Sequence, residues 1–282
     1  MPRDRFLTGL IGYPIAHSAA PAMHERAATA LGLHGHYQLI EVAGAGREDL
    51  RAMLDGARRL GFAGVNVTFP YKEAVVDLLD ELAPDARAIG AVNTIVVDGA
   101  RLVGHNTDAS GFARAIEPLL ATTPRGAIAL IGAGGVGKAI GFALAGLGVA
   151  ELRIFDADAA RAAQLAGQLQ GGVAVRSVAA ALDGATGLIN ATPVGMLPNR
   201  DMPVPDALLH PAMWVADAVY TPLWTPLLTA ARTKGAIVLT GRDLAINAAA
   251  DAFKLFTGMT PPTDVMAKAF VAVMAARYAA PA

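Results

Sequence analysis

The apolar positions of this chain form short continuous runs separated by stretches with helical spacing, a pattern typical of strands that alternate with helices. In the first part of the chain, the strand-like runs are residues 6–12, 36–42, 64–69, 94–98 and 101–105. Helical spacing predicts helices at residues 19–31, 47–60, 72–82 and 110–120. Asp98 and Gly99 favour a tight turn, so the last two strands are expected to form a hairpin.

The second part of the chain repeats this alternation with new elements. Strands are expected at residues 127–131, 151–155, 173–175, 187–190, 214–217 and 236–239. Helices are expected in the alanine-rich stretch after residue 137 and at residues 158–170, 226–234, 245–256 and 262–278. Strands alternating with helices predict an α/β fold with mostly parallel sheets. We expect an N-terminal domain over 1–113, a second domain over 114–241, and C-terminal helices over 242–282 that return to the first domain.

The strand predicted at residues 127–131 leads directly into a glycine-rich turn. This turn consists of Gly132, Ala133, Gly134, Gly135, Val136 and Gly137. Glycines at this spacing allow a tight turn and a close approach to a pyrophosphate, and the N-terminus of the next helix adds partial positive charge. The next strand ends on Asp156, about 20 residues later, where a carboxylate accepts hydrogen bonds from ribose hydroxyls. This carboxylate repels a 2′-phosphate, and Asp158 adds a second negative charge, so the sequence predicts a Rossmann domain that binds NAD rather than NADP.

A nucleoside-triphosphate-binding P-loop is the alternative for this segment, because Gly132 to Lys138 match its first seven positions. That loop next requires Ser or Thr to hold Mg²⁺, and residue 139 is Ala. The alternative therefore fails at a position that its chemistry needs.

Composition narrows the possible partners. The chain has 282 residues and a formal net charge of −1, so it lacks the positive field that attracts nucleic acid or an anionic membrane. It has no cysteine, which excludes disulfides, thiolate zinc sites and a Cys nucleophile. The six histidines form no H-E-x-x-H motif, and we expect no metal. The first residues contain no long apolar segment, which favours a cytoplasmic protein.

Polar residues gather at a few places in the otherwise apolar first part. These are His17 and Ser18, Asn66 and Thr68, Tyr71 and Lys72, Asn93, and residues 106–108. Alternation places Asn66 and Thr68 on one face of a strand, where buried polar groups need partners such as the hydroxyls of a bound polyol. Turn capping and backbone hydrogen bonding are the structural alternative, and for Asn93 and Thr107 taken singly the two interpretations have equal weight.

The order of several motifs resembles the shikimate dehydrogenase family, which includes the quinate/shikimate dehydrogenases. The motifs are I-A-H-S (15–18), N-V-T-F-P-Y-K (66–72), G-A-V-N-T (90–94), H-N-T-D (105–108), G-A-G-G-V-G-K-A (132–139), N-A-T-P-V-G-M (190–196) and Y-T-P-L-W-T-P-L-L (220–228). The resemblance covers essentially the whole chain. It implies a substrate-binding domain, a Rossmann domain and an active site in a cleft between them. It also implies reversible hydride transfer between a ring secondary alcohol and its ketone.

Lys72 and Asp108 match the catalytic pair of the family. Oxidation of an alcohol requires a group that removes the hydroxyl proton as hydride leaves, and a neutral lysine amine can accept it. The resemblance also implies binding roles for further residues. Those for the substrate are Ser18, Asn66, Thr68, Asn93 and Tyr220, and those beside the nicotinamide include Thr192 and Met196.

The chain departs from the family pattern at two substrate positions. Ala20 stands where the family usually has a second Ser, and Ala248 stands where a glutamine faces the substrate. Losing a hydrogen bond to a charged group costs roughly 1.5–3 kcal/mol. We hypothesise that Ala20 leaves room for the additional C1 hydroxyl of quinate.

The sequence therefore favours an NAD-dependent oxidoreductase that interconverts shikimate and 3-dehydroshikimate or quinate and 3-dehydroquinate, as a monomer or homodimer. An atypical enzyme for another cyclic hydroxy acid is the first alternative. A protein that senses NAD or a metabolite without turnover is the second, and retention of Lys72 and Asp108 argues against it.

Overall fold

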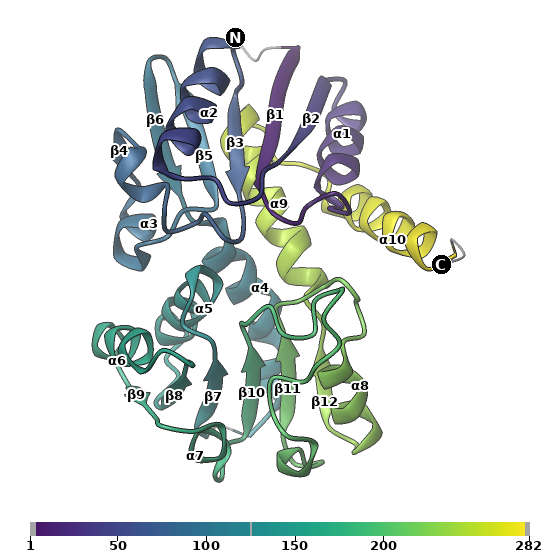
Figure 1. The fold of residues 1–282 in the computed structure, drawn as a ribbon. Helices are drawn as coiled ribbons and strands as arrows, with labels where there is room; N and C mark the ends of the chain where they lie inside the picture. Colours follow the sequence, from purple (N-terminus) through teal and green to yellow (C-terminus); the bar gives the residue numbers. More distant parts are fainter. Residues whose placement is uncertain (1–3, 125, 280–282) are drawn as a thin grey trace. The chain divides into compact units, whose positions relative to one another are not determined.

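The computed structural model describes residues 4–124 and 126–279, which fold into two compact α/β units. The first unit comprises Met1–Thr107 and Ile246–Ala282, and the second comprises Asp108–Ala245. Both changes of unit fall inside helices, α4 (Thr107–Thr122) and α9 (Arg242–Thr257) (Figure 1).

The first unit contains a six-stranded sheet in the order β2-β1-β3-β5-β6-β4. Its strands are β1 (Arg5–Gly12), β2 (His34–Glu41), β3 (Gly64–Val67), β4 (Glu81–Leu82), β5 (Thr94–Asp98) and β6 (Arg101–His105). β1 runs parallel to β2 and β3, whereas β5 is antiparallel to both β3 and β6. Asp98 pairs with Arg101, so the predicted hairpin is confirmed.

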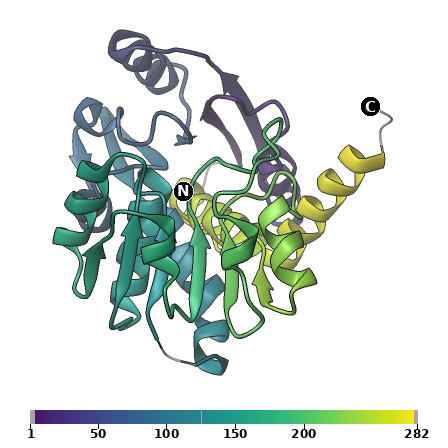
Figure 2. The same ribbon diagram turned by 60° about the horizontal axis from the view of Figure 1, so that its bottom comes forward.

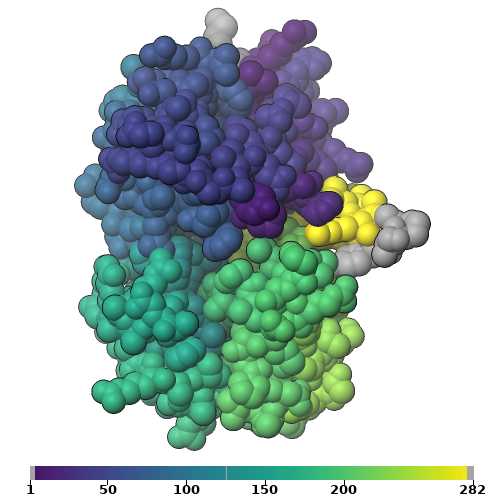
Figure 3. Space-filling view, viewed as in Figure 1, coloured from purple at the N-terminus to yellow at the C-terminus, as the bar shows by residue number. Residues whose placement is uncertain are grey.

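Helices cover this sheet because its strands present apolar side chains to both sides. α2 (Arg47–Arg59) buries Leu50 and Leu54 against Val65 and Val67 of β3. A second group of helices consists of α1 (Ala20–Ala30), α9 and α10 (Thr263–Ala279). α10 packs against α1, and the space-filling view shows its yellow residues bordering the purple N-terminal segment (Figure 3).

The segment at residues 72–82 is not the helix that its spacing predicts. It forms turns, the short 3₁₀ helix η1 (Val76–Leu78) and strand β4. Its backbone is bonded elsewhere in the sheet: Val92 donates to the carbonyl of Lys72, and Asp80 donates to the carbonyl of Leu102. Pairing with β6 therefore overrides the local helical pattern. α3 (Pro84–Ile89), which the pattern did not predict, follows immediately.

The second unit has a fully parallel six-stranded sheet in the order β9-β8-β7-β10-β11-β12. Its strands are β7 (Ile128–Ile131), β8 (Leu152–Phe155), β9 (Gly172–Ala174), β10 (Gly187–Asn190), β11 (Trp214–Asp217) and β12 (Ile237–Leu239). β7, the first strand of this unit, lies in the centre of the sheet. The chain adds β8 and β9 on one side of it and then β10, β11 and β12 on the other, which is the topology of a Rossmann fold. The predicted fold class is therefore confirmed.

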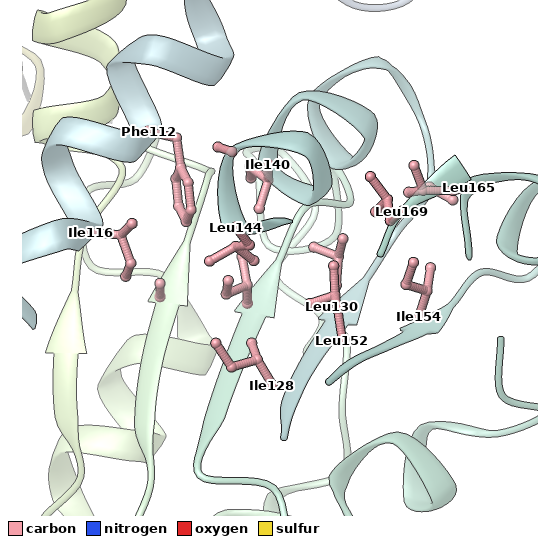
Figure 4. Packing of buried hydrophobic residues seen from close by; sticks show 14 of the residues in the cluster. Phe112, Ile116, Ile128, Leu130, Ile140, Leu144, Leu152, Ile154, Leu165 and Leu169 are labelled. Carbon is pink, nitrogen blue, oxygen red and sulfur yellow. The ribbon is translucent and has the colours of Figure 1, made fainter. Parts of the chain in front are cut away.

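Both faces of this sheet are buried by helices, as a parallel sheet requires. Ile128 and Leu130 of β7 face a core formed with α4, α5 (Gly135–Gly146) and α6 (Ala159–Gln168), as Figure 4 shows. Ala129 and Ile131 of the same strand face the opposite core, formed with α7 (Val178–Leu182) and α8 (Pro226–Thr233). Figure 2 brings the strands of this sheet forward. This arrangement leaves the carboxyl ends of the strands as the edge where a ligand can approach.

Candidate active site and coenzyme site

In the first unit, Asn66 lies at the carboxyl end of β3, opposite Thr94 of β5. Its Nδ2 donates to the carbonyl of Asn93 at 3.0 Å and to Oγ1 of Thr94 at 2.9 Å. Its Oδ1 accepts from the hydroxyl of the buried Tyr37 at 2.8 Å. The amide is half-buried and fixed in orientation. Tyr37 and Thr94 were missed by the sequence reasoning, because only the fold brings them next to Asn66.

Asn93 joins this group to the beginning of α4. Its Oδ1 accepts from the backbone N–H of Thr107 at 2.7 Å, and its Nδ2 donates to Oγ1 of Thr107 at 3.0 Å. Both residues are buried. The first N–H groups of a helix lack partners within the helix, so Asn93 satisfies one of them from the bend that precedes β5. The two side chains that sequence analysis treated singly therefore form one connected network, in which Asn93 has a clear structural role.

Lys72 follows the turn at the end of β3 and is only 8% exposed. Its carbonyl accepts from the backbone N–H of Val92, next to Asn93, which fixes its main chain at the same edge of the sheet. Asp108 is also 8% exposed, and it lies in the first turn of α4, immediately after Thr107. A carboxylate in a first helical turn is stabilised by the helix dipole. Lys72 belongs to the first unit and Asp108 to the second.

Ser18 lies in the loop between β1 and α1, with Thr68 at the end of the neighbouring β3. Oγ of Ser18 accepts from the backbone N–H of Ala20 at 3.2 Å, so its hydroxyl proton remains available to a ligand. Oε1 of Glu41 holds the same loop by accepting from the N–H groups of Ile15 at 2.9 Å and Ala16 at 3.4 Å. Sequence reasoning did not identify Glu41, because it lies at the end of β2, far from this loop in sequence.

Two further predicted substrate residues lie in different units. Tyr220 is half-buried in the segment after β11 in the second unit. Ala248 is 9% exposed within α9 in the first unit.

In the second unit, the glycine-rich turn connects β7 to α5. Gly132 has a φ of +103°, a conformation that favours glycine. A Cβ on Gly137 would lie 2.0 Å from the carbonyl oxygen of Gly132, so the helix can approach the turn only without a side chain. A Cβ on Gly134 would meet nothing within 4 Å among the described residues. Close packing behind the turn and open space at Gly134 fit a bound pyrophosphate, whose charge the N-terminus of α5 would stabilise.

Asp156 directly follows the neighbouring β8, and its side chain points back to this turn. Its Oδ2 accepts from the backbone N–H of Ala133 at 2.7 Å, and its Oδ1 accepts from the N–H of Asp158 at 2.9 Å. Asp158 in turn caps α6 through the N–H of Ala160. Arg153 bonds to Glu151 and to the carbonyl of Asp183, both in the second unit, and so is held within the strand region. The predicted coenzyme residues of this turn therefore form one local structure.

A buried polar network lies at the carboxyl ends of β10 and β11. Oδ1 of Asn190 accepts from the N–H of Thr192 at 3.0 Å and from its hydroxyl at 2.7 Å. Nδ2 of Asn190 donates to Oδ1 of Asp217 at 2.9 Å, and the hydroxyl of Thr225 donates to Oδ2 of Asp217 at 2.7 Å. Burial raises the pKa of Asp217 to about 7, although the hydrogen bonds from Thr225, Val219 and Asn190 oppose this change. Asp217 and Thr225 were not identified from the sequence.

The described part of the chain contains neither a membrane-spanning helix nor a cluster of metal-binding side chains. Among residues 4–124 and 126–279, no helix is long and apolar enough to cross a membrane. Within the same ranges, no group of three or more His, Asp or Glu side chains is placed to hold a metal ion.

The Rossmann sheet, its glycine turn and Asp156 define a dinucleotide-binding protein with a second α/β unit. The sequence profile of the shikimate dehydrogenase substrate-binding domain matches residues 10–95. The shikimate dehydrogenase (NADP(+)) of Streptomyces avermitilis is 44% identical over 271 residues, which cover 93% of each chain. The quinate/shikimate dehydrogenase (NAD(+)) of Corynebacterium efficiens is 41% identical over 97% of this chain and 100% of its own.

A solved structure agrees with these sequence matches. The quinate dehydrogenase from Corynebacterium glutamicum in complex with NAD superposes with a TM-score of 0.87, at 40% identity over 96% of this chain and 100% of that chain. The chain belongs to the shikimate dehydrogenase family, as its motifs predicted, and is an oxidoreductase of the class that acts on CH–OH groups.

Proposed function

We propose that this protein is an NAD-dependent dehydrogenase that interconverts the ring alcohol and ketone of shikimate- or quinate-type acids. The relatives include both NAD- and NADP-named enzymes, so the coenzyme must be argued from this chain's own residues. The position of Asp156 is the observation that favours NAD over NADP. Its carboxylate lies one hydrogen bond from the glycine turn, where it would accept from the ribose hydroxyls and repel a 2′-phosphate.

The bound nicotinamide would supply the hydride acceptor for this reaction. Lys72 is proposed to take the proton of the substrate hydroxyl, because it is buried beside the fixed backbone of residues 92 and 93. Asp108 is proposed to orient the Lys72 amine and the same hydroxyl. Asp108 lies in the first turn of α4, at the helix end where the dipole favours negative charge.

The fixed amides of the first unit would recognise the ring hydroxyls. Tyr37, Thr94 and Thr107 orient Asn66 and Asn93, and a side chain already held in position loses little entropy when substrate binds. Ser18 would donate its hydroxyl proton to the substrate carboxylate, since its acceptor side is bonded to the N–H of Ala20. The small side chain of Ala20 beside it supports quinate as a substrate, because it would leave room for the additional hydroxyl on C1 of quinate.

Initial rates of NADH formation with shikimate and quinate, measured in parallel and repeated with NADP, test this proposal. Turnover of either acid with NAD in preference to NADP is the expected result, and the ratio of the two acids identifies the better substrate. Absence of turnover with both acids would contradict the substrate assignment and favour another cyclic hydroxy acid. Preference for NADP would contradict the role given to Asp156.

A further inference from the structure

The loop at residues 191–196 is held from behind by buried side chains. Asn190 is fully buried, and its amide oxygen binds both the N–H and the hydroxyl of Thr192. Its amide nitrogen donates to the carbonyl of Val194 at 3.1 Å and to Asp217. The orientation of Asn190 therefore sets the conformation of this loop.

Asp217 fixes the orientation of Asn190, because an amide whose nitrogen must face a carboxylate cannot rotate by half a turn. The same carboxylate accepts from the N–H of Val219 at 2.9 Å and from the hydroxyl of Thr225. The oxygen of that hydroxyl also accepts from Leu228 and thereby caps α8. Thr225 thus connects the carboxylate of Asp217 to α8, which lies outside the 191–196 loop.

This network reaches the glycine turn by direct packing. A Cβ on Gly132 would lie 2.9 Å from Cγ2 of Thr192 and from the carbonyl carbon of Ala191, so the loop and the turn are in close contact. The loop also receives support from the segment after β11, where Leu197 donates to the carbonyl of Thr221 at 2.9 Å. Displacement of Thr192 would therefore alter the space around Gly132.

We propose that Asp217 and Thr225 are positioning residues for the coenzyme, acting through Asn190 to hold the 191–196 loop against the glycine turn. This inference rests on the proposed coenzyme function of the second unit. Neither side chain needs to touch the coenzyme. Their effect is to increase the fraction of molecules whose loop is ready to bind, and the apparent Kd varies inversely with that fraction.

Calorimetric titration with NAD, combined with steady-state kinetics, tests the proposal on Thr225→Val, which removes the hydroxyl and keeps the shape. We expect its Kd and KM for NAD to rise about tenfold. Its kcat at saturating NAD should change less than about twofold, because bound NAD restores the ordered loop. Thr225→Ser, which retains the hydroxyl, should bind NAD with an affinity close to that of the wild type.

Thr186→Val is the matched control, because it removes a hydroxyl bonded to the carbonyl of Ala127 at the opposite end of the same sheet. It should leave the Kd for NAD unchanged. An unchanged Kd in Thr225→Val, or an equal rise in Thr186→Val, would overturn the proposal. If Thr225→Val does not fold, Asp217→Asn provides the same comparison, since it retains an oxygen acceptor for Asn190 and replaces the one facing Thr225.

Calorimetry requires no turnover, so the two proposals can fail separately. Wild-type protein that binds NAD without oxidising either acid would contradict only the substrate assignment. Wild-type protein that does not bind NAD would overturn both the coenzyme assignment and the positioning role.

Discussion

Oδ2 of Asp156 accepts a hydrogen bond of 2.7 Å from the backbone N–H of Ala133. The residue expected to choose the coenzyme therefore also ties the end of β8 to the glycine turn. A substitution that removes the side chain changes both the local charge and the shape of the turn, so the two effects must be separated by design.

Asp156→Asn removes the charge while its amide oxygen can still accept from Ala133, so the bond to the turn is retained and only the bond from the N–H of Asp158 is lost. We expect the preference for NAD over NADP, measured as the ratio of kcat/KM values, to fall at least about tenfold. Asp158→Asn is the control, since Asn also caps helices well and Asp158 bonds to α6 rather than to the turn. An equal loss of preference in both variants would mean that general negative charge, not Asp156 itself, selects the coenzyme.

Lys72→Met and Asp108→Asn test the proposed proton-transfer pair. Each should lower kcat by about 10²- to 10⁴-fold, because a positioned acid or base contributes that much, while the Kd for NAD remains unchanged. Lys268→Met is a suitable control, since Lys268 is exposed on α10 and pairs with Asp264. Retention of full activity in Lys72→Met would exclude the lysine from the chemistry.

Two glycine substitutions should have opposite consequences. Gly137→Ala places a Cβ 2.0 Å from the carbonyl oxygen of Gly132, so we expect the second unit to lose stability. Gly134→Ala meets no described atom within 4 Å, so stability should be retained while NAD affinity falls, because the methyl group would enter the space assigned to pyrophosphate. Urea unfolding and NAD titration of both variants would check this contrast, and undiminished NAD binding by Gly134→Ala would contradict the assignment.

His24 should make the first unit sensitive to acid. Both ring nitrogens are buried without a hydrogen-bond partner among the described residues, and the ring lies against Tyr37 and Phe253. Burial lowers the pKa of His24 from 6.5 to about 3. Between pH 6.5 and about 3, the unfolded chain therefore binds a proton at His24 that the folded chain does not bind. The stability present above pH 6.5 is lost as the pH falls toward 3.

His24→Leu, which is close in volume and cannot be protonated, should remove this contribution and raise the urea midpoint at pH 5 more than at pH 7. Circular dichroism would report the midpoint, with His34→Leu at an exposed position as the control. Parallel pH dependence in wild type and His24→Leu would contradict the expectation.

Asp217 should produce the opposite dependence in the second unit. Because burial raises its pKa from 3.8 to about 7, the folded state holds a proton that the unfolded state releases. The resulting stability is complete below about pH 3.8 and is lost as the pH rises through 7. Trp214 is buried on the same strand, so its fluorescence can report unfolding in urea. For the wild type, the urea concentration at the midpoint should be lower at pH 8 than at pH 5.

Asp217→Asn cannot titrate, so its fluorescence midpoint should vary less over the same pH range. A change as steep as that of the wild type would assign the dependence to another group. This measurement concerns stability and is independent of the NAD titrations proposed for Thr225.

Most strands and the glycine turn were predictable because their signals are local. Gly187–Asn190 and Trp214–Asp217 have the bounds that their apolar runs predict. The helix expected at residues 72–82 was wrong because hydrogen bonds to distant strands determine that segment. For α3, Pro84 at its beginning and the left-handed Gly90 at its end were signals that the apolar pattern alone does not contain.

The polar networks were only partly predictable. Motifs indicated Asn66, Asn93 and Asn190, but their partners Tyr37, Thr107 and Asp217 are 14 to 29 residues away in sequence. Asp217 ends an apolar strand, where a single acid is usually a surface residue. Its burial becomes evident only when β10 and β11 are placed side by side.

The packing of α10 against α1 has a consequence for synthesis on the ribosome. The second unit is continuous in sequence, so all of its strands and most of its helices are available once residue 245 has emerged. The first unit is completed later, because the helix that covers α1 follows the second unit in sequence and is translated after it. The nascent chain therefore exposes the apolar side of α1 while the Rossmann unit folds, and this is the interval in which a chaperone would have a surface to bind.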